Sequence, residues 1–163
     1  MNEPARDVAD AGRRIIIGVI GAGVCDTKTT AQAERLGELL AKRGAVIACG
    51  GLGGVMEAVS CGASRAGGVV VGILPGSDKS SANRYVTISV ATGMGHARNV
   101  IIAQTADALV AVEGEYGTLS EIAVGLKLGK PVVAMGRWNR MDGVTPADSP
   151  EDAVEKVFSI LNY

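Results

Sequence analysis

The sequence predicts an α/β fold, in which a three-layer, doubly wound, mainly parallel sheet of the Rossmann-like type has helices on both faces. Short apolar, β-branched runs alternate with segments of helical periodicity along nearly the whole chain. The apolar runs are hydrophobic throughout, which is typical of strands buried on both faces, and strict alternation requires crossovers between parallel strands. At 163 residues one domain is expected, over residues 14–163, after an N-terminal extension of residues 1–13.

The first half of the chain alternates predicted strands and helices. The apolar residues of the first helix recur at helical spacing, and Gly44 follows as a typical C-terminal cap. Gly67 and Gly68 end the second helix, and the polar residues 75–84 are predicted to form a loop. We predict strands at residues 14–20, 45–49, 69–74 and 85–89 and helices at residues 29–43 and 55–66.

The second half repeats this alternation. Thr118 and Glu121 have the spacing of a capping box at the start of a helix, and Ser149-Pro150 is a typical N-cap followed by proline. Residues 137–148 are polar and are predicted to form a loop. We predict strands at residues 108–112 and 131–135 and helices at residues 93–104, 119–128 and 149–161.

Composition narrows the possible partners. Sixteen basic residues nearly balance seventeen acidic ones and only 3% of residues are aromatic, so we expect no nucleic acid. Three cysteines without CxxC spacing predict free, buried thiols and a cytoplasmic protein, and a single histidine disfavours a metal site. The N-terminal residues lack an apolar core and no apolar run approaches the length of a membrane span, so neither secretion nor membrane anchoring is expected.

Ten of the 23 glycines lie at four junctions that lead into predicted helices. In a doubly wound sheet these junctions share the carboxyl edge of the strands, where ligands bind. Glycine lets backbone amides approach a ligand and helix N-termini carry partial positive charge, so we expect a phosphorylated small molecule there. The candidate binding residues are Gly21, Ala22, Gly23, Gly50, Gly51, Gly53, Gly54, Gly114, Tyr116, Gly117 and Thr118.

Two familiar nucleotide-binding fingerprints are missing from these junctions. No glycine cluster completes GxGxxG with an acidic residue about 20 positions later, which disfavours NAD. The motif GxxxxGK[ST] is also absent, which disfavours ATP hydrolysis by a P-loop.

Two side chains near the junctions are candidates for catalysis. Arg98 can pair bidentately with phosphate, although a solvated surface arginine is the alternative. Glu121 either completes the capping box with Thr118 or offers a carboxylate for general acid–base work or for a sugar hydroxyl. His96 is more typical of a cap or surface residue, and Trp138 either covers a ligand ring or packs at a subunit contact.

These motifs together resemble the LOG-like superfamily, whose members are often labelled lysine decarboxylases. The resemblance covers about residues 15–135 and rests on the order and spacing of Gly50–Met56, Gly67–Val69, Arg98 and Gly114–Glu121. The run from Glu121 to Val132 is similar to a small branch that includes the molybdenum cofactor carrier proteins and a DprA-related family. The resemblance implies a Rossmann-like fold and homodimers or tetramers. No lysine lies in a context typical of pyridoxal phosphate chemistry, so lysine decarboxylation is rejected.

For the LOG enzymes, the resemblance implies hydrolysis of the N-glycosidic bond of cytokinin-type nucleoside 5′-monophosphates, which releases free base and ribose 5-phosphate. It assigns Arg98 and Glu121 to the catalytic pair and Gly114, Gly117 and Thr118 to the phosphate loop.

The chain departs from the enzyme pattern at several positions. Glu113 and Glu115 replace proline and glycine of the phosphate loop, Asn99 replaces lysine, and Glu57 replaces glycine. Carboxylates close to a bound phosphate disfavour its binding. These departures favour a binding protein, a carrier or sensor of a phosphate-bearing nucleotide or a molybdopterin-type cofactor. A nucleoside 5′-monophosphate phosphoribohydrolase is the alternative, a ligand-free regulatory subunit is a third, and whether the protein is an enzyme stays open.

Overall fold

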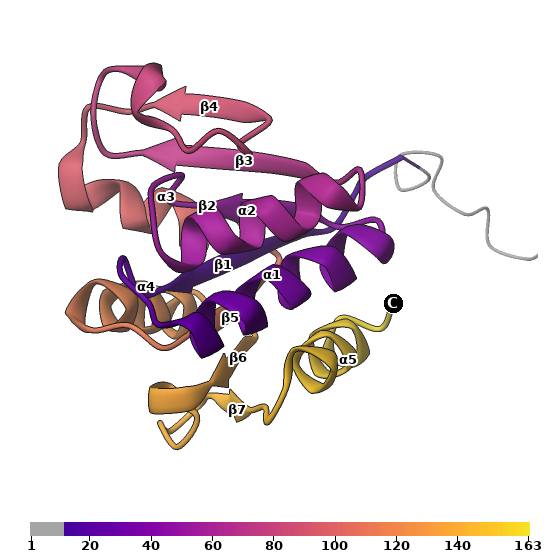
Figure 1. Ribbon diagram of the computed structural model, residues 1–163. Helices are drawn as coiled ribbons and strands as arrows, with labels where there is room; N and C mark the ends of the chain where they lie inside the picture. Colours follow the sequence, from indigo (N-terminus) through magenta and orange to yellow (C-terminus); the bar gives the residue numbers. More distant parts are fainter. Residues whose placement is uncertain (1–11) are drawn as a thin grey trace, which may run out of the picture.

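A seven-stranded sheet forms the middle layer of the protein. The structure, a computed structural model, describes residues 12–163, so nearly all of the predicted extension, residues 1–13, lies outside the described residues. The strand order is β4-β3-β2-β1-β5-β6-β7 and every neighbouring pair is parallel (Figure 1). The strands are β1 (Ile16–Gly21), β2 (Val46–Cys49), β3 (Val69–Leu74), β4 (Ile88–Ala91), β5 (Ala108–Val112), β6 (Val132–Met135) and β7 (Thr145–Pro146).

Helices cover both faces of this sheet, which confirms the predicted doubly wound fold. One face carries α1 (Thr27–Lys42), α2 (Val55–Arg65) and α5 (Pro150–Ile160), and the other carries α3 (Arg98–Thr105) and α4 (Tyr116–Lys127) (Figure 1). Short 3-10 turns are η1 (Lys79–Ser81), η2 (Gly95–Ala97) and η3 (Gly136–Trp138). Within residues 12–163, no helix is long and apolar enough to cross a membrane.

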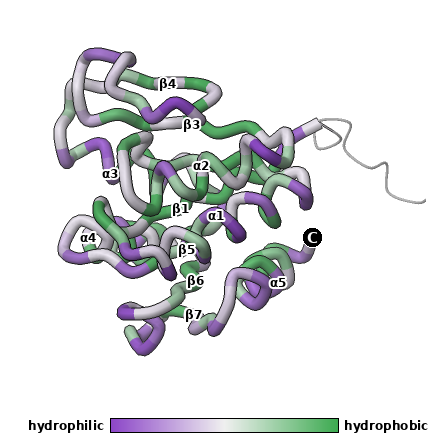
Figure 2. The backbone as a smooth tube through the Cα atoms, viewed as in Figure 1, coloured by the Kyte–Doolittle hydropathy of each residue, from purple (hydrophilic) through white to green (hydrophobic). Residues whose placement is uncertain are grey.

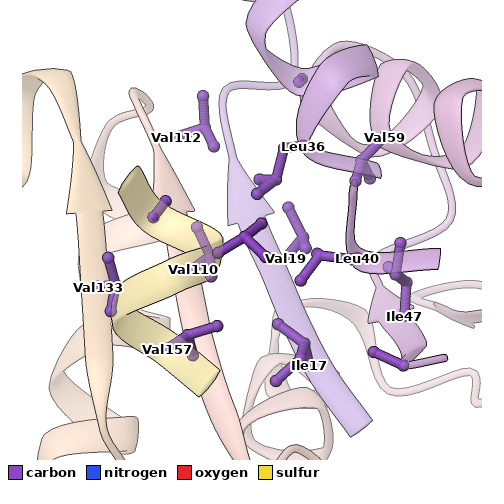
Figure 3. Packing of buried hydrophobic residues seen from close by; sticks show 14 of the residues in the cluster. Ile17, Val19, Leu36, Leu40, Ile47, Val59, Val110, Val112, Val133 and Val157 are labelled. Carbon is purple, nitrogen blue, oxygen red and sulfur yellow. The ribbon is translucent and has the colours of Figure 1, made fainter. Parts of the chain in front are cut away.

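Two apolar clusters hold the layers together, one on each side of the sheet. Ile17 and Val19 of β1 belong to the cluster under α1, α2 and α5, whereas Ile20 belongs to the cluster under α3 and α4. Figure 3 shows Leu36 and Leu40 of α1 reaching toward the strand side chains of the first cluster. The hydrophobic strands lie between helices whose outer faces are hydrophilic (Figure 2). Burial on both faces explains the continuous apolar runs of the strands.

The chain reverses its course across the sheet between β1 and β5. From β1 it passes outward through β2 and β3 to β4, and then returns to pair β5 with the free side of β1. The connection after β1 leads to α1 on one face and the connection after β5 leads to α4 on the other. A crevice therefore opens at the carboxyl ends of β1 and β5, the edge at the left of Figure 1.

The element boundaries differ from the predictions at several places, most of all at α3, which begins at Arg98 rather than at residue 93 because residues 95–97 form the turn η2. β4 begins at Ile88 rather than at residue 85, because the Asn83 side chain accepts the Tyr85 amide at 3.1 Å and holds a turn there. β7 lies in the predicted loop 137–148, and its two residues are too few to show periodicity. α1 begins at Thr27 rather than at residue 29, behind an N-cap at Asp26, and α4 begins at residue 116 rather than 119.

α1 and α2 pack with their backbones in close contact. A Cβ atom on Gly37 of α1 would overlap the carbonyl oxygen of Val59, and one on Gly62 of α2 would overlap the carbonyl oxygen of Glu34. Two glycines thus face the opposite helix, and neither carbonyl can move without distorting its own helix. This contact fixes α2 against α1 and with it the loop that precedes α2.

We expect Gly62→Ala to lower the free energy of unfolding by about 3 kcal/mol, since the new methyl group forces the helices apart. In a domain of this size the melting temperature would fall by about 6–12 °C. The control is Gly117→Ala in α4, where no atom lies within 4 Å of the added Cβ and helix propensity favours alanine. Equal melting temperatures for the two variants would contradict the close packing of α1 and α2.

Candidate functional site

A cleft of about 490 Å³ lies at the carboxyl edge of the sheet, where β1 and β5 meet. Ligand pockets in proteins span roughly 300–1,000 Å³, so a nucleotide-sized molecule can be accommodated. The residues that line it are Val19, Ile20, Gly21, Ala22, Gly23, Val24, Gly50, Met56, His96, Arg98, Asn99, Gly114, Glu115, Gly117, Thr118 and Glu121.

The structure brings most of the predicted site residues to this cleft. Both candidate catalytic residues line it, and so do Gly21, Ala22, Gly23, Gly50, Gly114, Gly117 and Thr118. The other four predicted residues are outside the lining. Gly51 packs against Gly72 and Leu74 of β3, Gly54 packs against the backbone of Gly23, and Tyr116 is 81% exposed. Gly53, which lies between Gly51 and Gly54 in the sequence, is also outside the lining.

The N-terminus of α4 opens into the cleft with unused backbone amides. Its N-cap is Glu115, whose side chain makes no capping hydrogen bond, and helix hydrogen bonding from the cap begins at the Leu119 amide. The amides of the first turn are therefore available to an anion. By contrast, the Asp26 side chain caps α1 by accepting a hydrogen bond from the backbone amide of Thr29 at 2.8 Å.

Of the two alternatives for Glu121, the capping box with Thr118 is wrong. Thr118 is the third residue of α4 and not its N-cap, because the helix begins at Tyr116 and includes Gly117. Glycine in a first helical turn costs only about 1 kcal/mol, which the buried position of α4 outweighs. Thr118 and Glu121 are both buried and both line the cleft, so the carboxylate faces the site rather than the helix end.

Arg98 lines the cleft, and only its Nη1 donates a hydrogen bond to a described residue. It is the first residue of α3, is only 8% exposed, and donates from Nη1 to the side-chain oxygen of Asn99. A Cβ atom on Gly50 would lie 2.7 Å from Nη2, so glycine at the end of β2 makes room for the guanidinium group. The buried Nε atom has no hydrogen-bond partner among the described residues. Nη2 also donates to no described residue, and because it is not enclosed it can donate to an acceptor of a ligand in the cleft.

A hydrogen-bond chain positions Arg98 against α4. The side-chain amide of Asn99 donates to the Ser120 hydroxyl at 3.3 Å, and this hydroxyl donates to the backbone carbonyl oxygen of Gly117 at 2.7 Å. The chain runs from α3 to the first turns of α4. It therefore couples the guanidinium group to the helix that carries the free amides and Glu121.

Glu121 is the second buried charged group of the cleft and is only 6% exposed. Burial raises the pKa of its carboxyl from 4.5 to about 7, and the Arg98 charge opposes this rise. No hydrogen bond from a described residue lowers it further. Near neutral pH the group therefore exists in both protonation states, as suits a proton donor or acceptor.

Only one of the two additional carboxylates lies beside the cleft. Glu115 lines it, but the Glu113 carboxylate accepts the amide of Arg137 at 3.3 Å and occupies space left by Gly136. The backbone of Glu113 has a φ of +51°, which turns its side chain from β5 toward η3. The expectation that both Glu113 and Glu115 stand against the phosphate loop is corrected for Glu113.

The other residues considered in the sequence analysis differ in whether they line the cleft. His96 lines the cleft from η2. Trp138 lies outside the lining, packs against the apolar cluster under α3 and α4, and stacks with Arg137 at 5.0 Å from its ring centroid. Cys49 and Cys61 are buried as expected, whereas Cys25 is half-buried, and all three are free thiols.

Seven lining residues were not among the predicted site residues, namely Val19, Ile20, Val24, Met56, His96, Asn99 and Glu115. Val19 and Ile20 belong to the buried strand β1 and Val24 to the loop that follows it. Asn99 follows Arg98 directly and Met56 ends a glycine motif, so proximity to a predicted residue was the available signal.

With this geometry in view, the family of the protein can be determined. The model of the SLOG cluster4 family matches residues 14–160. The chain belongs to this family. An uncharacterized protein of Archaeoglobus fulgidus is 51% identical over 143 residues, which cover 88% of this chain and 94% of the relative.

Solved structures similar to this SLOG cluster4 protein include two with named ligands. The molybdenum cofactor binding protein of Rippkaea orientalis is 36% identical with a TM-score of 0.88, over 93% of this chain and 99% of that one. The molybdenum cofactor carrier protein of Chlamydomonas reinhardtii is 34% identical with a TM-score of 0.83, over 93% and 100%. The predicted resemblance to the carrier branch is confirmed.

Glu121 makes the stability of this SLOG cluster4 protein depend on pH. Between pH 4.5 and about 7 the folded state holds a proton that the unfolded chain has released, so the free energy of unfolding falls as pH rises through this range. The difference between the two pKa values corresponds to about 3 kcal/mol.

We expect Glu121→Gln to remove this dependence, so that the variant is more stable than the wild type above pH 7 by an amount that disappears near pH 4.5. Urea denaturation over this pH range measures the difference. Glu155→Gln, which changes an exposed carboxylate, is the control. Parallel stability profiles for wild type and Glu121→Gln would contradict the raised pKa.

Proposed function

We propose that the carboxyl-edge cleft of this protein binds a phosphate-bearing pterin of the molybdenum cofactor type and that the protein carries this cofactor. The observation that carries the proposal is the buried Arg98 with its unpaired Nη2, which lines the cleft next to the uncapped N-terminus of α4. The similarity of this protein to the Rippkaea and Chlamydomonas proteins supports the same ligand class.

The residues of the cleft fit the chemistry of such a ligand. Free amides at the start of α4, beside the small loop Gly21–Gly23, suit a phosphate group. Arg98 supplies a fixed positive charge, since a guanidinium group stays protonated at physiological pH. The cleft volume of about 490 Å³ exceeds what a phosphate alone requires, which leaves room for a ring system.

A carrier needs to hold its ligand without reacting with it, and the side chains of the cleft are consistent with that role. Glu115 places a carboxylate at the phosphate loop and weakens the anion site relative to a loop without charge. Moderate affinity suits a protein that releases its cargo.

We expect Arg98→Ala to weaken the binding of molybdopterin about 10- to 100-fold, the effect of one lost charge-assisted hydrogen bond to a buried donor. Purified protein would be incubated with molybdopterin released from a molybdoenzyme, and bound pterin measured by fluorescence after gel filtration. Arg140→Ala, which removes an exposed arginine outside the cleft, is the matched control. Binding by Arg98→Ala equal to that of the wild type, or no binding by the wild type, would contradict the proposal.

Hydrolysis of a nucleoside 5′-monophosphate is a second candidate function, favoured by the raised pKa of Glu121 beside Arg98. A carboxyl group with a pKa of about 7 can donate or accept a proton at neutral pH during cleavage of an N-glycosidic bond. Release of free base that is lost in Glu121→Ala would identify this activity, and release unchanged in that variant would reject it.

We also propose that the protein forms homodimers or larger homo-oligomers in the cytoplasm. Ile88 and Val90 of the edge strand β4 are 51% and 39% exposed, and Val100 of α3 is 39% exposed. Ile88 and Val90 pair with Val71 and Ile73, which pack under α3, so all three exposed residues lie on that side of the sheet. β4 is a hydrophobic segment at the end of the sheet (Figure 2). Exposed apolar surface on an edge strand favours contact with a second copy.

We expect the wild type to have at least twice the mass of the 16.6 kDa chain in light scattering after gel filtration, and Val90→Asp to shift it to the monomer mass because a buried charge opposes the contact. Ile160→Asp, at an exposed apolar residue of α5, is the control. A wild type that elutes as a monomer would contradict the proposed contact.

A further inference from the structure

Two buried side chains of the cleft have hydrogen-bonding capacity that no described residue uses. Arg98 and Glu121 are 8% and 6% exposed, so each is more than nine-tenths buried, and both line the cleft. Buried polar groups without partners are rare because each costs free energy. One of these groups needs hydrogen-bond donors and the other needs an acceptor. Together they indicate which donors and acceptors a ligand in the cleft presents.

Glu121 requires donors. When ionised its carboxylate only accepts hydrogen bonds, and its two oxygens suit two parallel N–H groups. The causes that set its pKa are burial and the Arg98 charge, with no contribution from a hydrogen bond. Both oxygens are therefore available to a ligand.

Arg98 requires an acceptor at one particular atom. Nη1 already donates to Asn99, whereas Nη2 donates to no described residue and lies beside Gly50, which has no side chain to cover it. Nε is fully enclosed, so a ligand in the cleft meets Nη2 and not Nε. The ligand edge that fits the pair therefore presents two donors to Glu121 and an acceptor to Arg98.

We propose that Glu121 and Arg98 together recognise the 2-amino-4-oxopyrimidine edge that pterins and guanine share. This edge presents an amino group, a ring N–H and a carbonyl oxygen in sequence, which match the carboxylate and the guanidinium Nη2. This inference rests on the proposed function and specifies which group of the ligand lies against which residues.

Competing groups satisfy only one of the two side chains. A phosphate would accept from Arg98 but would be repelled by the Glu121 carboxylate. A sugar diol would donate to Glu121 but offers no carbonyl to Arg98. The adenine edge lacks two adjacent donors.

The position of Glu121 along α4 leaves a separate place for a phosphate. Glu121 follows Gly117 by four residues, or about 6 Å along the helix axis. The free amides at the helix start can hold a phosphate while Glu121, one turn further along, holds the ring edge. A ligand with a phosphate at one end and this ring at the other would use both.

The experiment compares ligands that differ only in the 2-amino group. Wild type, Glu121→Gln and Arg140→Ala would be titrated at pH 8 with GMP against IMP, and with pterin against lumazine. Calorimetry measures the nucleotides and pterin fluorescence the second pair. We expect wild type and Arg140→Ala to prefer the amino-bearing member of at least one pair by about tenfold or more, as for one bidentate contact. In Glu121→Gln, which replaces one acceptor by a donor, this preference disappears.

The two pairs distinguish a pterin from a guanine as the ligand that supplies the edge. A preference for the amino-bearing member only within the pterin pair identifies a pterin site, and a preference within both pairs identifies a site that accepts either ring. Equal binding within both pairs would overturn the edge recognition, and so would a preference that persists in Glu121→Gln. If molybdopterin still binds in either case, the proposed carrier function stands without it. If wild type binds neither molybdopterin nor any of the four probes, both proposals fail.

Discussion

β1 pairs with β2 on one side and with β5 on the other, and the connections that follow β1 and β5 leave the sheet toward opposite faces. A strand followed by a crossover to a parallel neighbour almost always turns in the right-handed sense, so the two helices cannot both cover the end of β1. The gap that remains is the cleft. Glu121 comes from α4, which follows β5, and Arg98 comes from α3, which follows the edge strand β4.

That gap stays open only because backbones approach closely around it. Gly54 packs against the loop after β1, and Gly50 makes room for Arg98. A Cβ atom on Gly114 would overlap the Thr118 hydroxyl and lie 3.1 Å from the Ala22 amide nitrogen. Side chains at these positions would fill the cleft or push its walls apart. The apolar clusters on both sides of the sheet then hold the walls rigid, which allows a buried carboxyl group to keep a pKa near 7 instead of gaining a water shell.

Sequence patterns predicted the architecture because buried parallel strands and amphipathic helices have distinct periods, and they predicted the edge where Arg98 and Glu121 meet because that edge follows from topology. They failed where the outcome depends on a few dihedral angles. Glu113 turns away from the cleft through one positive φ value, and Thr118 lies inside α4 because the helix tolerates Gly117. The unpaired Nη2 of Arg98 depends on where Asn99 and Gly50 direct the guanidinium group, which no spacing in the sequence shows.

The relation between Arg98 and Glu121 argues for a ligand site rather than a structural ion pair. A structural pair gains stability when the two charges form hydrogen bonds to each other, yet in this cleft the arginine donates to Asn99 and acts on the carboxyl group through its charge alone. Ionised Glu121 therefore costs stability that the fold must supply from its apolar clusters. Burial that weakens the fold and leaves a donor and two acceptors unused is the arrangement expected where a bound molecule completes the hydrogen bonding. A carrier and a hydrolase can share this arrangement, and they differ in whether Glu121 meets a ring edge or a glycosidic bond.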